Sequence, residues 1–215
     1  MSMVIAVDGP TASGKGTLAR RLAAHFGFAY LDTGSLYRAA ALRLLRAGGD
    51  GADTDAAVAA AQGIGPDDLA DPALREEATG NMASRVAALQ PVRDALFALQ
   101  RDFAACPPAG LPGAVLDGRD IGTVVCPDAR VKLFVTADVA ARARRRHLEL
   151  TGQGQEVAYE TVLRDLKDRD ARDSARATAP LARADDAVLI DTTKLDIEAA
   201  FSAALEACAS RMDGS

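Results

Sequence analysis

A glycine-rich stretch with a single lysine, GPTASGKGT at residues 9–17, follows closely on an apolar run over residues 3–7. An apolar strand, a glycine-rich turn and a helix beginning near Lys15 direct backbone N–H groups and the positive end of a helix dipole toward one point. The glycines allow close backbone approach, and Lys15 supplies a positive charge for β- and γ-phosphates. This spacing indicates a loop for a nucleoside triphosphate, although a βα turn without a ligand would share its glycines. The predicted triphosphate-binding residues are Gly9, Pro10, Thr11, Ala12, Ser13, Gly14, Lys15, Gly16 and Thr17.

Gly16 departs from the usual phosphate-binding loop, in which Ser or Thr follows the lysine and contacts magnesium. Thr17 is here the first hydroxyl on the predicted helix, where it could serve the phosphates or a magnesium-bound water. The order Gly-Lys-Gly-Thr is similar to that of nucleoside monophosphate kinases. We therefore interpret Gly16 as a variant of the loop and not as damage to it.

Two further segments, LDTGSLYR at 31–38 and DGRDIGT at 117–123, each follow a predicted strand. Ligands of open α/β sheets bind beyond the carboxyl ends of the strands, so both segments are expected to face the ligand of the loop. Arg38 and Arg119 could then hold a second phosphate, although either one alone is also typical of a solvated surface. Asp117 could hold magnesium through water, but a turn or N-cap role fits a strand end equally well.

The segment DRDARDSAR at 168–176 is dense in both charges. If it is helical, Arg169, Asp173 and Arg176 share one face, a spacing that also makes plain intrahelical ion pairs. Taken alone, such a segment is more typical of a solvated face than of a binding site.

Arginine carries nearly all of the positive charge of the chain, which either reflects composition or indicates repeated binding of anions through two parallel hydrogen bonds. Arg142, Arg145 and Arg146 share one face of a predicted helix. Such an array could cover the negative charge that develops on a transferred phosphoryl group.

The composition bounds the class of protein. A length of 215 residues suits one domain with a single core, and the net charge of −5 argues against an extended nucleic-acid or anionic-membrane surface. No apolar run approaches the roughly 18 residues of a membrane span. Cys106, Cys126 and Cys208 contain no CxxC pair, which disfavours a disulfide framework or a zinc site. We expect a soluble cytoplasmic protein that binds neither nucleic acid nor membrane.

Short apolar runs without alternation, separated by longer helical segments, must position these residues. Runs of this kind are typical of parallel strands buried on both faces, so the pattern predicts an α/β fold with a five-stranded parallel sheet and crossover helices. The predicted strands are residues 4–7, 28–31, 114–116, 131–135 and 187–190.

Helix signals fill most of the intervals. The flanking helices are predicted over 16–26, over 35–47 with Ser35 as N-cap, over 138–150 with Asp138 as N-cap, and over 197–210 capped by Asp196. Between Gly48 and Gly113 no strand is evident, and this helical excursion is interpreted as an inserted substrate-binding lobe. Its predicted helices are 53–62, 72–88 and 91–105, the last two with proline at the N1 position.

Together these motifs resemble the bacterial-type cytidylate kinase family. GPTASGKGT, DTGSLYR, DGRDIGTVV and RDARDSARATAPLARADDAVLIDTT occur in family order over essentially the whole chain. The resemblance implies transfer of the ATP γ-phosphoryl group to CMP or dCMP with Mg²⁺. It also implies a single domain over 1–215, with strand order 2-3-1-4-5, a monophosphate-binding lobe near 35–110 and a lid near 142–158. It favours a monomer.

The same resemblance implies the roles of individual residues. A carboxylate such as Asp120 can accept a hydrogen bond from the amino group of cytosine, while arginines donate to the acceptors of the base. Uracil would set a carbonyl oxygen against the same carboxylate, which disfavours it. No side-chain base is needed, because the second pKa of a phosphate is about 6, so His25 and His147 need no catalytic role. The implied CMP-binding residues are Thr33, Arg38, Ser84, Arg93, Arg119, Asp120, Arg169, Asp173 and Arg176. From the chemistry of the residues given above we also predict Lys15, Arg119, Arg142 and Arg145 as catalytic residues, and Thr17 and Asp117 as indirect magnesium ligands.

Two features depart from the family pattern. Residues 61–83 are short and helical or irregular where many members carry a longer, partly β-stranded insertion, and the proline of QPVR stands one place from its usual position before Arg93. The alternatives are a related kinase that acts on AMP or UMP, and a nucleotide-binding regulator whose arginine site docks a protein without turnover.

Overall fold

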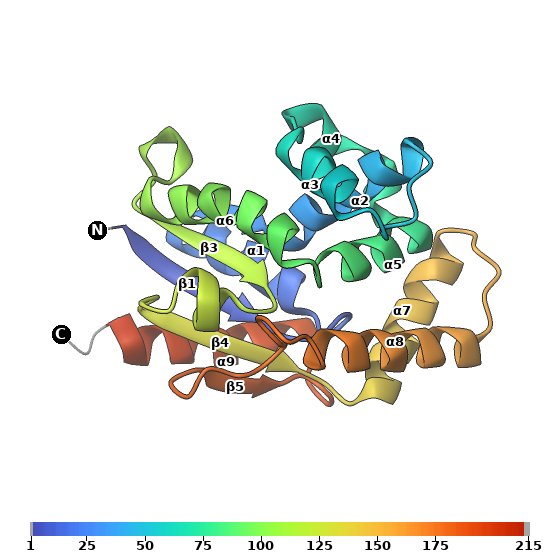
Figure 1. The fold of residues 1–215 in the computed structure, drawn as a ribbon. Helices are drawn as coiled ribbons and strands as arrows, with labels where there is room; N and C mark the ends of the chain where they lie inside the picture. Colours follow the sequence, from blue (N-terminus) through green and yellow to red (C-terminus); the bar gives the residue numbers. More distant parts are fainter. Residues whose placement is uncertain (1, 213–215) are drawn as a thin grey trace.

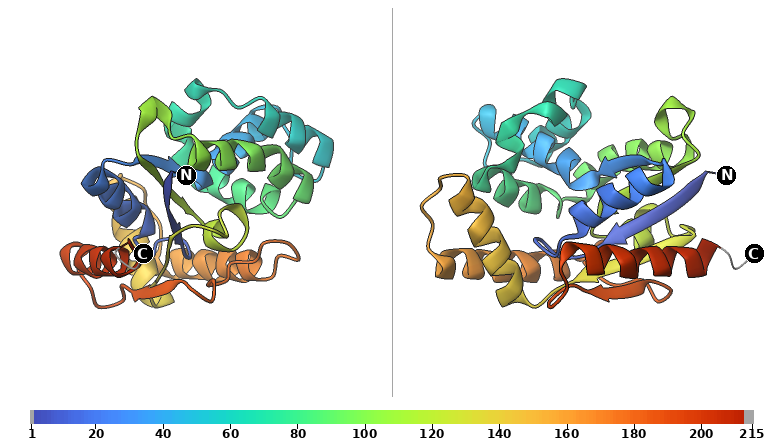
Figure 2. Two further views of the ribbon diagram at one scale, coloured as in Figure 1. Left: turned by 90° about the vertical axis from the view of Figure 1, so that its left-hand side faces the viewer. Right: turned by 180° about the vertical axis from the view of Figure 1, so that it is seen from behind.

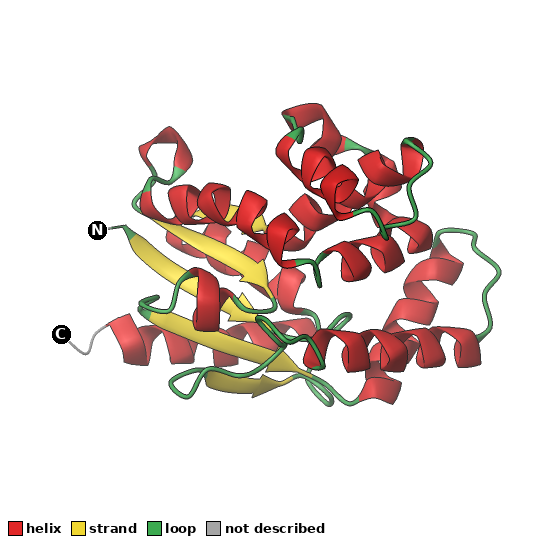
Figure 3. Ribbon diagram, in the orientation of Figure 1, coloured by secondary structure: helices red, strands yellow, loops and turns green. Residues whose placement is uncertain are grey.

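The computed structural model describes residues 2–212. At its centre lies a five-stranded parallel sheet in the order β2-β3-β1-β4-β5, with helices on both faces (Figure 1; Figure 3). The α/β fold and the strand order are therefore confirmed. The strands are β1 (Met3–Asp8), β2 (Ala29–Asp32), β3 (Gly113–Gly118), β4 (Val131–Thr136) and β5 (Val188–Asp191).

Helices cover the sheet and extend beyond it. They are α1 (Lys15–Phe26), α2 (Thr33–Arg46), α3 (Thr54–Gln62), α4 (Pro66–Ala70), α5 (Glu77–Val86), α6 (Gln90–Ala105), α7 (Val139–Gly152), α8 (Tyr159–Ser174) and α9 (Ile197–Met212). Shorter segments are the 3₁₀ turns η1 (Pro72–Arg75) and η2 (Pro108–Gly110) and the π-helical turn η3 (Ile121–Val125). No helix within residues 2–212 combines the length and apolar character that a membrane crossing requires.

The alternation of side chains along β1 divides the core into two layers. Ile5 and Val7 pack with residues of α1 and α9 on one face of the sheet. Ala6 packs on the other face with residues of η3 and α6, among them Ile121 and Ala104. Asp8 is therefore expected on the same face as Ala6, toward η3.

Two helical groups lie beyond the arrowhead ends of the strands (Figure 1; Figure 2). Helices α2, α3 and α5 belong to the first group and share a core with α6, which itself runs back alongside β3; this core includes Leu36, Leu44, Val86 and Leu96. Helices α7 and α8 make up the second group and pack around Ala143 and Leu166, and α8 also packs against α5. The carboxyl end of the sheet is thus flanked by both groups.

Three local predictions are wrong. Asp32, and not Ser35, caps α2, because its carboxylate accepts from the Ser35 N–H at 3.3 Å and the helix starts directly after β2. The predicted helix 72–88 breaks at Glu76, whose extended ψ of 149° separates η1 from α5. Pro91 occupies N2, since α6 begins at Gln90 after the N-cap Leu89.

Two other caps are confirmed. Asp138 accepts from the Ala140 and Ala141 amides at 2.8 and 3.4 Å at the start of α7. Asp196 accepts from the Ala199 amide at 2.8 Å before α9. Sequence reasoning missed α4 and η3 altogether, because one is a single turn and the other has π-helical hydrogen bonds that no propensity pattern indicates.

Leu22 gives a test of the core between α1 and the sheet. Its side chain is fully buried among Ile5, Val7 and residues of α9. We expect Leu22→Ala to lower the free energy of unfolding by about 2–5 kcal/mol, measured by urea denaturation. The matched control is Leu148→Ala, which removes a leucine that is 70% exposed and should change stability by less than about 0.5 kcal/mol. Equal effects of the two substitutions would contradict this packing.

Candidate active site

The glycine-rich loop joins β1 to α1 and presents free amides. Gly9 has φ of 151°, and a Cβ there would lie 2.0 Å from the Val135 carbonyl oxygen, so only glycine fits. Gly14 is the left-handed N-cap of α1, and no side chain bonds the first amides of this helix. Because those amides and the helix dipole favour an anion, the start of α1 is suited to phosphate.

Lys15 and Asp117 meet beside this loop. Lys15 Nζ lies 3.4 Å from Asp117 Oδ1, and the Tyr30 hydroxyl donates to Asp117 Oδ2 at 3.3 Å. Burial raises the pKa of Asp117, while the charge of Lys15 opposes the shift. Burial also lowers the pKa of Lys15, as does the nearby Arg119.

The same carboxylate explains the unusual glycine after the lysine. A Cβ on Gly16 would lie 2.9 Å from Asp117 Oδ2, closer than a side chain is tolerated. A serine or threonine at this position would therefore displace the Lys15–Asp117 pair. Gly16 is a consequence of the buried aspartate that stands beside the lysine.

A pocket between the loop, the two helical groups and the ends of β2 and β3 is lined by many arginines; we call it the arginine pocket. All the implied CMP-binding residues line it, although they come from four separate helices and two connections. These are Thr33, Arg38, Ser84, Arg93, Arg119, Asp120, Arg169, Asp173 and Arg176, together with Lys15 and Asp117. Sequence reasoning missed Tyr37 and Ala87 in the same lining; Tyr37 could have been found, since it directly precedes Arg38 in DTGSLYR.

Besides Asp117, two further buried carboxylates lie in the arginine pocket with different partners. Asp120 accepts from Arg93, and burial raises its pKa against the charge of that arginine. Asp173 accepts from Ser84 at 3.1 Å, from Arg119 at 3.1 Å and from Arg176. Burial opposes the ionisation of Asp173, but the surrounding arginines outweigh it and lower the pKa.

Three guanidinium groups, those of Arg38, Arg119 and Arg169, also gather in this pocket. Burial, together with the positive charges of the neighbouring Arg119 and Arg38, lowers the pKa of Arg169 to about 9. The Nε atoms of Arg169 and Arg176 are buried without a hydrogen-bond partner. Gly80 leaves room for the group, since a Cβ there would lie 3.1 Å from Arg38 Nη1 and 3.4 Å from Arg169 Nη1. Like charges and unpaired donors gathered in this way are suited to an anion.

Arg142 and Arg145, predicted as catalytic residues, lie outside the arginine pocket. Arg142 donates to the Thr11 carbonyl at 3.1 Å and pairs with Asp170 at 2.5 Å, so it joins the loop to α8. Arg145 donates to the Thr192 hydroxyl at 3.0 Å and lines a hollow along Gly14, Lys15 and Thr17. Both stand next to the loop, and their catalytic roles stay predictions.

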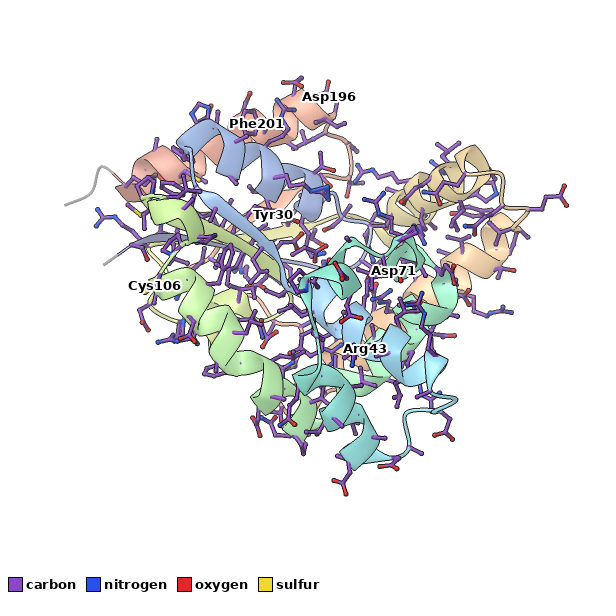
Figure 4. All side chains as sticks on the ribbon, turned by 90° about the horizontal axis from the view of Figure 1, so that it is seen from above. Tyr30, Arg43, Asp71, Cys106, Asp196 and Phe201 are labelled. Carbon is purple, nitrogen blue, oxygen red and sulfur yellow. The ribbon has the colours of Figure 1, made fainter. Side chains whose placement is uncertain are left out.

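A second, largely apolar hollow lies on the far side of the loop; we call it the α9 hollow. It is lined by Thr17, Leu18, Thr192, Leu195 and Ile197 among others. A bidentate pair of Arg21 with Glu198, at 2.7 and 2.8 Å, bridges α1 to α9 at its rim. Asp196 and Phe201 mark this end of α9 beside α1 (Figure 4). Sequence reasoning missed this hollow, because its walls are ordinary apolar residues of two distant helices.

Asp8, at the end of β1, is a further buried group that sequence reasoning missed. Its two carboxylate oxygens accept from the Ile121 and Gly122 amides, both at 2.8 Å. Burial raises its pKa from 3.8 to about 7 against these two hydrogen bonds, and the Asp120 and Asp117 carboxylates add to the shift. The arrangement ties the strand that carries the glycine-rich loop to the segment that carries Asp120.

The raised pKa of Asp8 makes stability depend on pH. The folded protein keeps a proton between about pH 4 and pH 7 that the unfolded chain has released, so stability falls as pH rises through this window. The slope that one group contributes is at most about 1.4 kcal/mol per pH unit. We expect urea denaturation of wild type and Asp8→Asn to diverge between these pH values, with wild type losing more stability. Parallel curves would contradict this assignment.

Comparisons with known proteins agree with this geometry. A family model described as "Cytidylate kinase" matches residues 5–210. A cytidylate kinase from Rhodospirillum rubrum is 57% identical over 204 residues, which cover 95% of this chain and 96% of that protein. One from Xanthobacter autotrophicus is 58% identical over 212 residues, which cover 99% of this chain and 100% of that protein.

Two solved structures share the fold. An uncharacterized protein from Eubacterium ventriosum aligns with a TM-score of 0.54 at 16% identity, over 97% of this chain and 99% of its own. A Thermus thermophilus protein aligns with a TM-score of 0.52 at 19% identity, over 99% of both chains. By the family model and the sequence relatives, the chain belongs to the cytidylate kinase family of ATP-dependent nucleoside monophosphate kinases.

Proposed function

We propose that this member of the cytidylate kinase family transfers the γ-phosphoryl group of ATP to CMP or dCMP, giving ADP and CDP or dCDP. The observation that carries the proposal is the arginine pocket. Three guanidinium groups and a buried Asp120–Arg93 pair line it together with residues of the glycine-rich loop. A phosphate would match the guanidinium groups, and a base that offers an amino group would match Asp120.

In this proposal ATP binds along the loop from the α9 hollow. Its adenine packs against Leu18, Leu195 and Ile197. Its phosphate oxygens accept hydrogen bonds from the backbone amides at the start of α1. Lys15 then stands between donor and acceptor, because it lines both the arginine pocket and the hollow along the loop.

The acceptor nucleotide occupies the arginine pocket. Arg38, Arg119 and Arg169 bind its phosphate, and the unpaired Nε–H of Arg169 gains a partner there. The cytosine amino group donates to Asp120, while Arg93, Ser84 and Arg176 supply donors to the ring. Asp173 accepts hydrogen bonds from the ribose hydroxyls. Thr33 lines the pocket at the end of β2.

The residues act by positioning and by neutralising charge. The attacking oxygen of the acceptor phosphate is largely ionised near neutral pH, since its pKa is about 6, so no side chain has to remove a proton. Holding two anions in line would be opposed by their repulsion, which Lys15 and the arginines offset. Arg142 and Arg145 hold the loop and its neighbouring backbone in place for this alignment.

Magnesium fits the donor side of the site. No group of three or more His, Cys, Asp or Glu gathers as a metal site within residues 2–212, so the ion would arrive with the phosphates, as Mg²⁺ commonly does. The Thr17 hydroxyl and the Asp117 carboxylate would hold it indirectly, through water. The bound ion would neutralise charge on the phosphates of the donor.

The two helical groups would act as moving parts. We assign residues 35–110 as the monophosphate-binding lobe and residues 142–158 as the lid of a single domain over 1–215. The first segment supplies Arg38, Ser84 and Arg93 to the lining of the arginine pocket, and the second includes most of α7, which packs against α8. Figure 2 shows the two groups of helices from two further sides. We also propose a cytoplasmic monomer.

A turnover assay tests the function. ADP formation is followed with ATP and each of CMP, dCMP, UMP and AMP, and we expect CMP and dCMP to be the preferred acceptors. Equal or better use of AMP or UMP would favour a related kinase instead. Binding of ATP without turnover on any monophosphate would favour a nucleotide-binding regulator.

A further inference from the structure

Asp8 lies outside the lining of the arginine pocket, yet it is bonded to the segment that forms one wall of it. The carboxylate stands at the end of the central strand β1, and its side chain points to the face that carries η3. Both oxygens are used, one on each of the first two amides of η3. Those amides are at the start of a helical turn, where backbone donors have no partner within the turn.

The residue just before these amides is Asp120, which is the N-cap of η3. The Asp120 carbonyl accepts from Val124 and Val125 at 2.9 and 3.1 Å, so its backbone belongs to the turn that Asp8 holds. The Asp120 side chain is buried against Arg93. Its aim into the pocket therefore depends on where η3 is fixed relative to the sheet.

A glycine stands on each side of the contact between the Asp8 carboxylate and the amides of η3. Gly9, which follows Asp8, has no room for a side chain because of the Val135 carbonyl, and this fixes the path of the chain at Asp8. At Gly122 a Cβ would lie 3.4 Å from Asp8 Oδ2 and 3.1 Å from Lys132 Cδ. A larger residue at position 122 would thus crowd the Lys132 side chain first and would also come into van der Waals contact with the carboxylate that its own amide binds, so that η3 would have to shift relative to β1 and β4.

We propose that Asp8 is a positioning residue for recognition of the acceptor base: it fixes η3 so that Asp120 meets the cytosine amino group. The proposal rests on the function proposed above. Asp8 touches neither nucleotide and acts through Asp120. The residue that begins the turn into the phosphate-binding loop thereby also sets the choice of acceptor.

Asp8→Asn tests the proposal while keeping the shape of the side chain. The amide can accept only one of the two backbone N–H groups and sets a donor against the other. At pH 8, where wild-type Asp8 is ionised, we expect the ratio of kcat/KM for CMP to that for UMP to fall about tenfold or more. The KM for CMP should rise, while the KM for ATP should stay within about twofold.

Gly122→Ala approaches the same contact from the other side and leaves Asp8 in place. It should lower the CMP preference in the same direction. Asp53→Asn is the matched control, since Asp53 also accepts from a backbone amide, that of Ala56 at 3.0 Å, but caps α3 away from the pocket. This variant should keep the wild-type ratio.

The outcomes separate the proposals. Calorimetric titration of CMP into each folded variant gives a second measure of acceptor binding, and thermal unfolding reports on folding. If Asp8→Asn and Gly122→Ala keep the wild-type CMP preference, or if KM for ATP changes most, Asp8 serves the phosphate-binding loop and the proposal is wrong. If the wild-type protein itself shows no preference for CMP, the proposed function fails first.

Discussion

Lys15→Met is expected to lower kcat for phosphoryl transfer to CMP by about 10³-fold, equivalent to about 4 kcal/mol of transition-state stabilisation. Lys15 is the one lysine that lines the arginine pocket, and it also lines the hollow along the loop. Negative charge accumulates between donor and acceptor during transfer, and a fixed cation at this place stabilises it. Methionine keeps much of the length of the side chain but removes the charge.

The fold should tolerate this substitution. Removing one partner of a buried ion pair leaves the other without compensation, and here the remaining partner is Asp117. Burial already raises the pKa of Asp117, so it can take up a proton, and the Tyr30 hydroxyl still lies 3.3 Å away. Stability is measured by urea denaturation, and kcat at saturating ATP and CMP.

Lys167→Met is the matched control. Lys167 is an exposed lysine of α8, outside the lining of the arginine pocket. This variant should keep the wild-type kcat. A Lys15→Met enzyme with more than about a tenth of the wild-type kcat would show that the arginines, and not this lysine, supply most of the stabilisation.

The sheet and its flanking helices were predictable because their signals are local. Continuous apolar runs such as 131–135 identify buried parallel strands, and the aspartates before α7 and α9 identify their starts. The start of α2 was mistaken because DTGS offers two capping residues, Asp32 and Ser35, three positions apart. The break at Glu76 depends on backbone angles that no apolar period indicates.

The site was predictable in a different way. Thr33 and Arg176 are far apart in the chain, and nothing in their spacing predicts that they share a pocket. The resemblance to a family joined them, and the structure brings them to one lining. Asp8 had no such support, because a single aspartate at the end of an apolar strand gives no pattern; only the Ile121 and Gly122 amides give it a role.

Gly16 is unusual in the sequence, and the structure gives a physical reason for it. From the sequence it is a glycine in place of the expected hydroxyl, similar to monophosphate kinases. In the structure it is the space that Asp117 occupies beside Lys15. The loop thus lacks a side-chain hydroxyl at this position and has a buried carboxylate there instead, beside Lys15.

Asp120→Asn is expected to shift the preference between CMP and UMP by about 100-fold toward UMP. In the proposed function the carboxylate accepts from the amino group of cytosine, and it would face the carbonyl oxygen of uracil, a pairing of two acceptors. Asparagine is nearly the same size and can turn its amide N–H toward that carbonyl, while its own oxygen still accepts from Arg93. The substitution therefore exchanges one recognition pattern for the other and keeps the Arg93 contact, so the fold should survive.

The measurement is kcat/KM for CMP and for UMP at fixed saturating ATP, with KM for ATP measured in parallel. Asp94→Asn is the matched control, because Asp94 is an exposed aspartate of α6 next to Arg93 that accepts from the Gln90 side chain at 2.6 Å and lies outside the lining of the arginine pocket. An unchanged CMP preference in Asp120→Asn would mean that the base is recognised elsewhere in the pocket. Since Asp8 acts only through Asp120, an Asp8→Asn effect on discrimination should also vanish in the Asp120→Asn background, and a persistent effect would separate the two residues.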